Sequence, residues 1–143
     1  MNKIKFYDNS HNQIRIERKK IRKIIEIIFI EEGFDYELIS LIFCDDEYLL
    51  NLNRKFLKHD FYTDILTFDI SDTQSIAGEL YISMERIKEN AKKFNVKNKV
   101  ELSRVIIHGI LHLLKYKDKF KNEKIIMREK EDYYLGKLDE EIK

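Results

Sequence analysis

Two histidines in the C-terminal half of the chain, His108 and His112, are four positions apart. In a helix this spacing places both imidazoles on one face. The residues around them are almost all apolar, which predicts a helix buried on most sides. Two buried imidazoles side by side are costly unless each finds a partner, and one metal ion would serve both. The pair therefore indicates a metal site, although purely structural helices show the same spacing.

A third candidate ligand follows this helix. The apolar run ends at Leu114, and Asp118 lies in a lysine-rich stretch from which its carboxylate could return to the histidines. Two imidazoles and one carboxylate leave a fourth position of a tetrahedral zinc ion for water, as in catalytic zinc sites. We therefore predict that His108, His112 and Asp118 bind one Zn²⁺ per chain.

The residue directly after the first histidine is Gly109. Glycine inside a helix costs about 1 kcal/mol relative to alanine, so its presence predicts close approach by another backbone or by substrate, unless the packing simply tolerates it. The metalloprotease pattern H-E-x-x-H needs a glutamate at this position as general base. A protease mechanism of that type is therefore excluded.

Length and composition predict one globular domain over residues 1–143. The chain has 143 residues, of which 43% are hydrophobic, and a formal net charge of +1. This balance argues against binding of nucleic acid by bulk charge, but it permits a local basic surface. A single cysteine excludes a disulfide framework and a cysteine-built zinc cluster, and Cys44 lies in an apolar run typical of a buried thiol.

Neither a signal peptide nor a membrane-spanning run is visible in the sequence. We therefore expect a cytoplasmic protein without membrane contact. The other two histidines, His11 and His59, lie in polar turns where solvent exposure is expected.

The hydrophobic pattern predicts four strands and five helices. The expected strands cover residues 3–7, 36–44, 64–70 and 79–83, the last two joined by a polar loop as a neighbouring pair. The expected helices cover residues 17–33, 45–57, 84–95, 99–114 and 122–138, and Gly33 caps the first. Strands come early and helices late, which predicts an α+β fold with a four-stranded mixed sheet and the metal site on a buried helix of the C-terminal half.

Three segments of the chain resemble the YbeY family. Residues 108–118, HGILHLLKYKD, followed by Met127 and Glu131, resemble that family's signature H-G-x-L-H-L-x-G-Y-D-H with a trailing M-x-x-x-E. Leu52-Asn53 and residues 60–68 are similar to its second block, and residues 78–83 to its L-G-D-I-x-I-S segment. The three blocks occur in family order and at matching spacing.

This resemblance implies a zinc-dependent endoribonuclease specific for single strands. Its roles would be the 3′ maturation of 16S RNA in the small ribosomal subunit and ribosome quality control. Ribosomal RNA and the small subunit are then the expected partners, and no dinucleotide cofactor is expected. The alternative is a metal-bearing ribosome-assembly factor with little activity of its own. A zinc hydrolase of peptides or amides is a third class, which Gly109 disfavours.

The chain departs from the family pattern at three positions. The third family histidine falls on Asp118, which we expect to give a working variant site whose metal is a weaker acid toward water. The family arginine falls on Leu57; if that arginine binds phosphate, the role must pass to Arg54, Lys55, Lys58 or Arg104. The family glycine before the tyrosine is Lys115, which should alter how the helix ends.

The expected catalytic group is a water on the zinc held by His108, His112 and Asp118. It could attack the phosphate as hydroxide, or the ribose 2′-OH could be activated instead. No protein base is identified, and Asp64 and Glu79 are weak candidates.

Basic residues near the predicted ligands could bind RNA. Seven Lys or Arg and three acids lie between Lys115 and Lys130, although the same lysines could form no more than a solvated helix face. Tyr116 could be a stacking surface or part of the core, and Phe120 is a second candidate for stacking. The predicted RNA contacts are Arg104, Lys115, Lys117 and Lys119.

Overall fold

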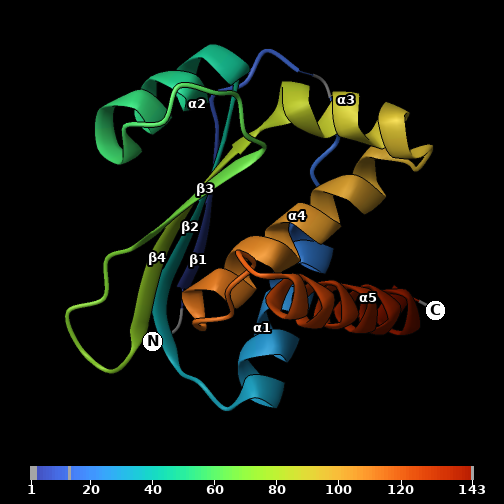
Figure 1. Ribbon diagram of the computed structural model, residues 1–143. Coiled ribbons are helices and arrows are strands. Elements are labelled where there is room, and N and C mark those ends of the chain that lie inside the picture. The colour runs from blue at the N-terminus through green and yellow to red at the C-terminus, as the bar shows by residue number, and fades with distance from the viewer. Residues whose placement is uncertain (1–2, 13, 143) are drawn as a thin grey trace.

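A four-stranded mixed sheet and five α-helices form the single domain, as predicted (Figure 1). The computed structural model describes residues 3–12 and 14–142. The elements in chain order are β1 (Lys3–Asp8), α1 (Arg18–Glu32), β2 (Tyr36–Cys44), α2 (Asp46–Leu52), η1 (Asn53–Leu57), β3 (Ile65–Asp69), β4 (Ile76–Ser83), α3 (Met84–Phe94), α4 (Asn98–Leu113) and α5 (Lys121–Ile142).

The strand order is β1-β2-β4-β3. β2 pairs in parallel with β1 and β4, and β3 pairs antiparallel with β4, which confirms the predicted neighbouring pair. β4 begins at Ile76, three residues before its predicted start. The reason is tertiary: Ile76 pairs with Tyr36 of β2, and Gly78 pairs with Asp69 of β3, so backbone pairing extends the strand past its alternating segment.

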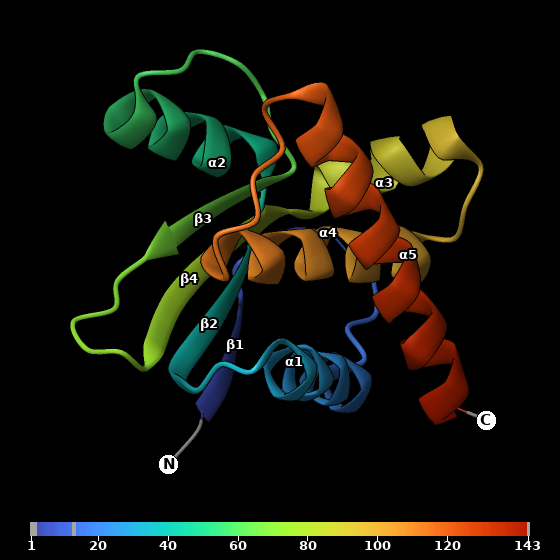
Figure 2. The ribbon, with the colours of Figure 1, turned by 60° about the horizontal axis from the view of Figure 1, so that its bottom comes forward.

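α4 packs across one face of the sheet, and α1 and α5 pack around it (Figure 2). Its side chains Ile106, Ile107 and Ile110 are fully buried and share a core with Leu80 and Ile82 of β4. The helix that carries both histidines is therefore fixed on several sides.

α2 covers the other face of the sheet. A small core of Cys44, Leu49 and Leu66 forms there. The Cys44 thiol donates to the carbonyl of Ile82 at 3.4 Å, and burial raises its pKa to about 12. This confirms the buried structural thiol. The predicted helix 45–57 is α-helical only to Leu52 and continues as the π-helical turn η1.

α4 ends in the same way as a helix with a C-terminal glycine, although the residue is Lys115. Lys115 adopts the left-handed conformation with φ 76°, and the amide of Tyr116 donates to the carbonyl of Leu111 at 3.1 Å. The expectation that lysine changes the helix end was therefore wrong. The Lys115 ammonium donates to the Asp69 carboxylate at 2.8 Å, a contact that ties the turn to β3.

No helix of the described residues combines the length and the apolar character needed to cross a bilayer.

Close packing against side chains, not against backbone or substrate, explains Gly109. A Cβ there would lie 2.6 Å from Cδ1 of Ile65 and 2.8 Å from Cδ2 of Leu80. We expect Gly109→Ala to lower the free energy of unfolding by about 1–2 kcal/mol, because overpacking outweighs the gain in helix propensity. Gly136→Ala is the control: Gly136 lies in α5 with no atom within 4 Å of its would-be Cβ, and alanine should stabilise by about 0.5–1 kcal/mol. Urea unfolding measures the change in the free energy of unfolding for each variant. Changes of equal size and sign in both would contradict the packing explanation.

The Lys115–Asp69 contact predicts a pH dependence of stability. Hydrogen bonds from Lys115 and Ser71 lower the pKa of Asp69 to about 2. Because the folded pKa is depressed, the stabilisation is present above the unfolded pKa of about 3.9 and is lost as the pH falls towards 2. Asp69→Asn should therefore destabilise the protein slightly at pH 6, and its difference from wild type should shrink below about pH 4. Urea unfolding across this range measures it; a difference that stays constant would contradict the assignment.

Candidate metal centre

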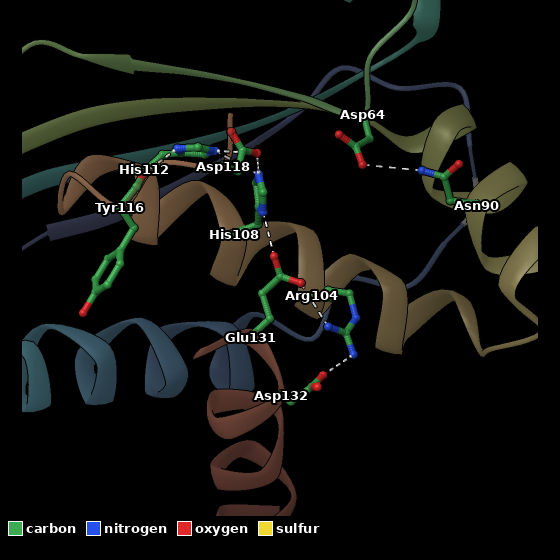
Figure 3. Close-up of polar contacts among 9 residues, drawn as sticks. All are labelled: Asp64, Asn90, Arg104, His108, His112, Tyr116, Asp118, Glu131 and Asp132. Carbon is green, nitrogen blue, oxygen red and sulfur yellow. Dashed lines mark hydrogen bonds and ion pairs between the residues drawn. The ribbon is translucent and has the colours of Figure 1, made fainter. Parts of the chain in front are cut away.

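α4 places His108 and His112 one turn apart on the side that faces β3 (Figure 3). Their ring centroids are 4.5 Å apart at an interplanar angle of 80°. Their Nε2 atoms face each other at 2.9 Å. The helical spacing noted in the sequence thus brings two imidazole nitrogens to one point.

The loop after α4 brings Asp118 to the same point. Oδ2 of Asp118 lies 3.1 Å from Nε2 of His108 and 3.3 Å from Nε2 of His112. The left-handed turn at Lys115 reverses the chain and makes this return possible. Among the described residues, this is the single group of three or more histidine, cysteine or acidic side chains close enough to hold a metal ion together.

Hydrogen bonds on the far side of each ring orient the two imidazoles. Nδ1 of His112 donates to the carbonyl oxygen of Tyr116 at 2.9 Å, and Nδ1 of His108 donates to Oε2 of Glu131 at 2.7 Å. Both partners can only accept, so each neutral ring carries its proton on Nδ1 and turns the lone pair of Nε2 toward Asp118. Such outer partners fix the ring orientation of metal-binding histidines.

The three converging atoms fit a cation. Two imidazole lone pairs and a carboxylate oxygen are all acceptors, and they lie 2.9 to 3.3 Å apart. A tetrahedral zinc ion with bonds of about 2.0–2.1 Å separates its ligand atoms by about 3.3 Å. The side chains of His108, His112 and Asp118 could therefore hold a metal ion, and the chemistry of the set suits zinc.

Glu131 links this site to α5. Its carboxylate is buried, with 6% of the residue exposed, and it also accepts from Nη1 of Arg104 at 3.0 Å. Burial opposes its ionisation, but the hydrogen bonds from His108 and Arg104 outweigh burial and lower the pKa of Glu131. Burial likewise opposes the charged form of His108, yet the bond to Glu131 and the nearby acids raise the pKa of His108.

The contact of Glu131 with His108 was not predicted from the sequence. Its sequence signal was the spacing to Met127: two residues four apart on a helix share a face, and Met127 is buried. A carboxylate on that face needs a buried partner. Asp132, which accepts from Nη2 of Arg104 at 2.8 Å, was also missed.

An open groove of about 420 Å³ runs beside the three side chains, and we call it the β3 groove. It is lined by Thr63, Asp64, Ile65, Leu66, Thr67, Asp69, His108, His112, Leu113 and Asp118. Burial raises the pKa of Asp64. Glu79, the other acid considered as a base, lies on the face of the sheet that points away from α4. Side chains alternate along a strand, and its neighbours Gly78 and Leu80 both face α4.

The predicted RNA contacts differ in their surroundings. Arg104 is held by Glu131 and Asp132, and Lys115 by Asp69. Lys117 and Lys119 are exposed. The contacts of these residues with RNA stay a prediction.

The two aromatic residues considered for base stacking differ in burial. The ring of Tyr116 packs against the main core, and its hydroxyl donates to Oε1 of Glu32 at 2.6 Å. Phe120 is 61% exposed. Phe120 is therefore accessible for stacking, whereas Tyr116 belongs to the core.

Leu57, at the position of the family arginine, is 44% exposed at the end of η1. Of the residues considered in its place, Arg54 pairs with Asp60 at 2.5 Å and Lys55 lies over the ring of Phe56. Lys58 is exposed in the left-handed turn that follows.

The two N-terminal histidines are both exposed, as predicted, His11 beside Asp45 and His59 stacked on Phe61.

Comparison with known proteins identifies the family of the chain. The family model of Endoribonuclease YbeY matches residues 6–139. Endoribonuclease YbeY of Porphyromonas gingivalis is 43% identical over 142 residues, which cover 99% of this chain and 94% of the relative. The Cytophaga hutchinsonii protein of the same name is 46% identical over 132 residues, covering 92% of each. The solution structure of TM1509 from Thermotoga maritima superposes with a TM-score of 0.64 at 29% identity, covering 99% of this chain and 91% of that one. The chain belongs to the Endoribonuclease YbeY family.

Proposed function

We propose that this protein is a zinc-dependent endoribonuclease that cleaves single-stranded RNA. The observation that carries the proposal is the convergence of two imidazoles and one carboxylate at an open groove, in a family named for endoribonuclease activity. Its proposed substrate is the 3′ region of 16S RNA in the small ribosomal subunit, with a part in ribosome quality control. The proposed compartment is the cytoplasm.

His108, His112 and Asp118 would hold the zinc ion. Bound there, zinc would polarise a phosphoryl oxygen and make water available as a nucleophile near neutral pH. Glu131 holds the His108 ring in place. Asp64 lines the same groove, and its raised pKa suits a group that accepts a proton during the reaction.

Side chains around the groove support an RNA substrate. The loop that carries Asp118 also carries exposed Lys117 and Lys119 and the exposed ring of Phe120. The first part of α5 adds exposed Lys121 and Lys124. Single strands are bound by cations along the backbone and by aromatic rings under the bases, and this surface offers both.

Loss of a ligand should remove both zinc and activity. We expect about one zinc per wild-type chain, much less in His112→Ala and Asp118→Ala, and a fall in cleavage of about two orders of magnitude or more. Asp118→His should keep the zinc and cleave at least as fast as wild type, because a neutral ligand leaves the metal more acidic. The measurements are metal analysis of purified protein and cleavage of a labelled single strand beside its duplex.

Unchanged cleavage by His112→Ala would assign the activity to a contaminant. Small-subunit binding by such a preparation would then favour the assembly-factor alternative.

Glu131→Gln should weaken zinc binding about 10- to 100-fold, because the His108 ring loses its charged acceptor. Competition with a colorimetric chelator measures the affinity, and the visible spectrum of the cobalt-substituted protein reports the geometry of the site. Glu129→Gln, an exposed change of the same chemistry on the same helix, is the control and should bind zinc like wild type. Equal affinities for both variants would show that Glu131 does not position His108.

A further inference from the structure

A second hollow of about 430 Å³ adjoins the metal centre, and we call it the α3–α5 pocket. Its lining includes Asp64, Phe94, Glu101, Arg104, His108 and Glu131. Asp64 and His108 also line the β3 groove, so the two hollows meet at these residues. Figure 3 shows Asp64 and Asn90 across from the part of α4 that leads away from His112. A strand whose phosphate lies at the metal centre could place its neighbouring nucleotide here.

Glu101 is the unusual feature of this pocket. The residue as a whole is only 4% exposed, and within residues 3–12 and 14–142 its carboxylate has no hydrogen bond or ion pair, although the charges of Arg104 and Arg128 act on it. Burial and the charge of Asp64 raise the pKa of Glu101, and the charges of Arg104 and Arg128 oppose them. The carboxylate oxygens are not among the enclosed side-chain atoms that lack a partner, and Glu101 lines the pocket, so these oxygens open into the pocket. A ligand there could donate hydrogen bonds to a carboxylate that no described residue engages.

A second metal ion does not fit the pocket. Its other two acids are already engaged, Asp64 with the Asn90 amide at 3.4 Å and Glu131 with His108 and Arg104. Within the described part of the chain, these acids do not converge closely enough to share an ion. A metal ion is therefore not the partner of Glu101, which leaves the pocket to a ligand that donates hydrogen bonds.

The rim of the pocket suits a flat ring. Phe94 is 56% exposed there, next to partly exposed Val96 and Val100, and the volume lies within the range of small-ligand sites. In single-stranded RNA, bases stack on aromatic side chains and are read at their Watson–Crick edges. An ionised carboxylate needs two adjacent donors, and guanine presents them as N1–H and the exocyclic N2 amine. The edges of adenine, cytosine and uracil place an acceptor beside each donor.

We propose that the α3–α5 pocket binds a guanine base of the RNA beside the cleaved phosphate and that Glu101 selects this base. The inference rests on the proposed endoribonuclease function, because it names the nucleotide that the same site prefers. Phe94 supplies the stacking surface, and Glu101 accepts from N1 and N2 of the base.

Replacement of guanosine by inosine tests this directly, since inosine lacks the N2 amine. The probes are uridine-rich single strands that carry one guanosine or one inosine at either side of a cleaved bond. Wild type should cleave the guanosine strand about tenfold faster or more, and the metal-free protein should bind it more tightly by a similar factor. In Glu101→Gln both ratios should fall to about one.

Two further variants separate selection from folding and from general binding. Phe94→Ala, an exposed change, should weaken binding of both strands and leave the guanosine-to-inosine ratio as in wild type. Glu89→Gln, an exposed change on α3 outside the pocket, should behave like wild type in every assay. Urea unfolding of each variant confirms that it is folded.

If wild type cleaves and binds the guanosine and inosine strands equally well, or prefers adenosine or cytidine, the inference is overturned while the endoribonuclease function stays intact. Absence of cleavage with the guanosine preference still present in metal-free binding would overturn the function and support the base pocket. A guanosine preference retained in folded Glu101→Gln would overturn the role of Glu101.

Discussion

The site depends on one electrostatic constraint: three acceptor atoms, Nε2 of His108, Nε2 of His112 and Oδ2 of Asp118, lie about 3 Å apart. No donor within the group can satisfy all three, so the arrangement favours a cation. The outer bonds to Glu131 and to the Tyr116 carbonyl prevent the rings from turning their Nδ1 protons inward. The protein therefore holds the lone pairs in place before any ion arrives.

Rigid packing makes this possible. α4 lies so close to the sheet that Gly78 and Gly109 each face a neighbouring side chain where a Cβ would be, and this contact sets His108 beside β3. The candidate ligand that comes from a loop, Asp118, is more exposed than either histidine. Two of the three candidate ligands are thus fixed by the core and the third by a turn, and one side of the cluster opens to the β3 groove.

Local patterns predicted most of the elements, and residues whose partners are far along the chain were predicted least well. The strand 36–44 and the first four helical segments are visible as periodicity, and the His108–His112 spacing follows from the same helix. Arg104 was predicted from the sequence as an RNA contact, and its pairing with Glu131 and Asp132 was not foreseen, because these two acids lie on another helix. Gly109 suggested an approaching backbone or substrate, whereas side chains of two strands fill the space.

The sequence by itself determined the fold class, the helix with two histidines on one face and the nearby acid, because these depend on hydrophobic period and on short spacings. Only the tertiary structure decided which charged groups are buried and paired, and that Tyr116 belongs to the core. It also decided that Glu101, without a partner among the described residues, lines a pocket beside the candidate metal centre. Burial and pairing arise where separate elements meet, and no local pattern of residue types records which surfaces will come into contact.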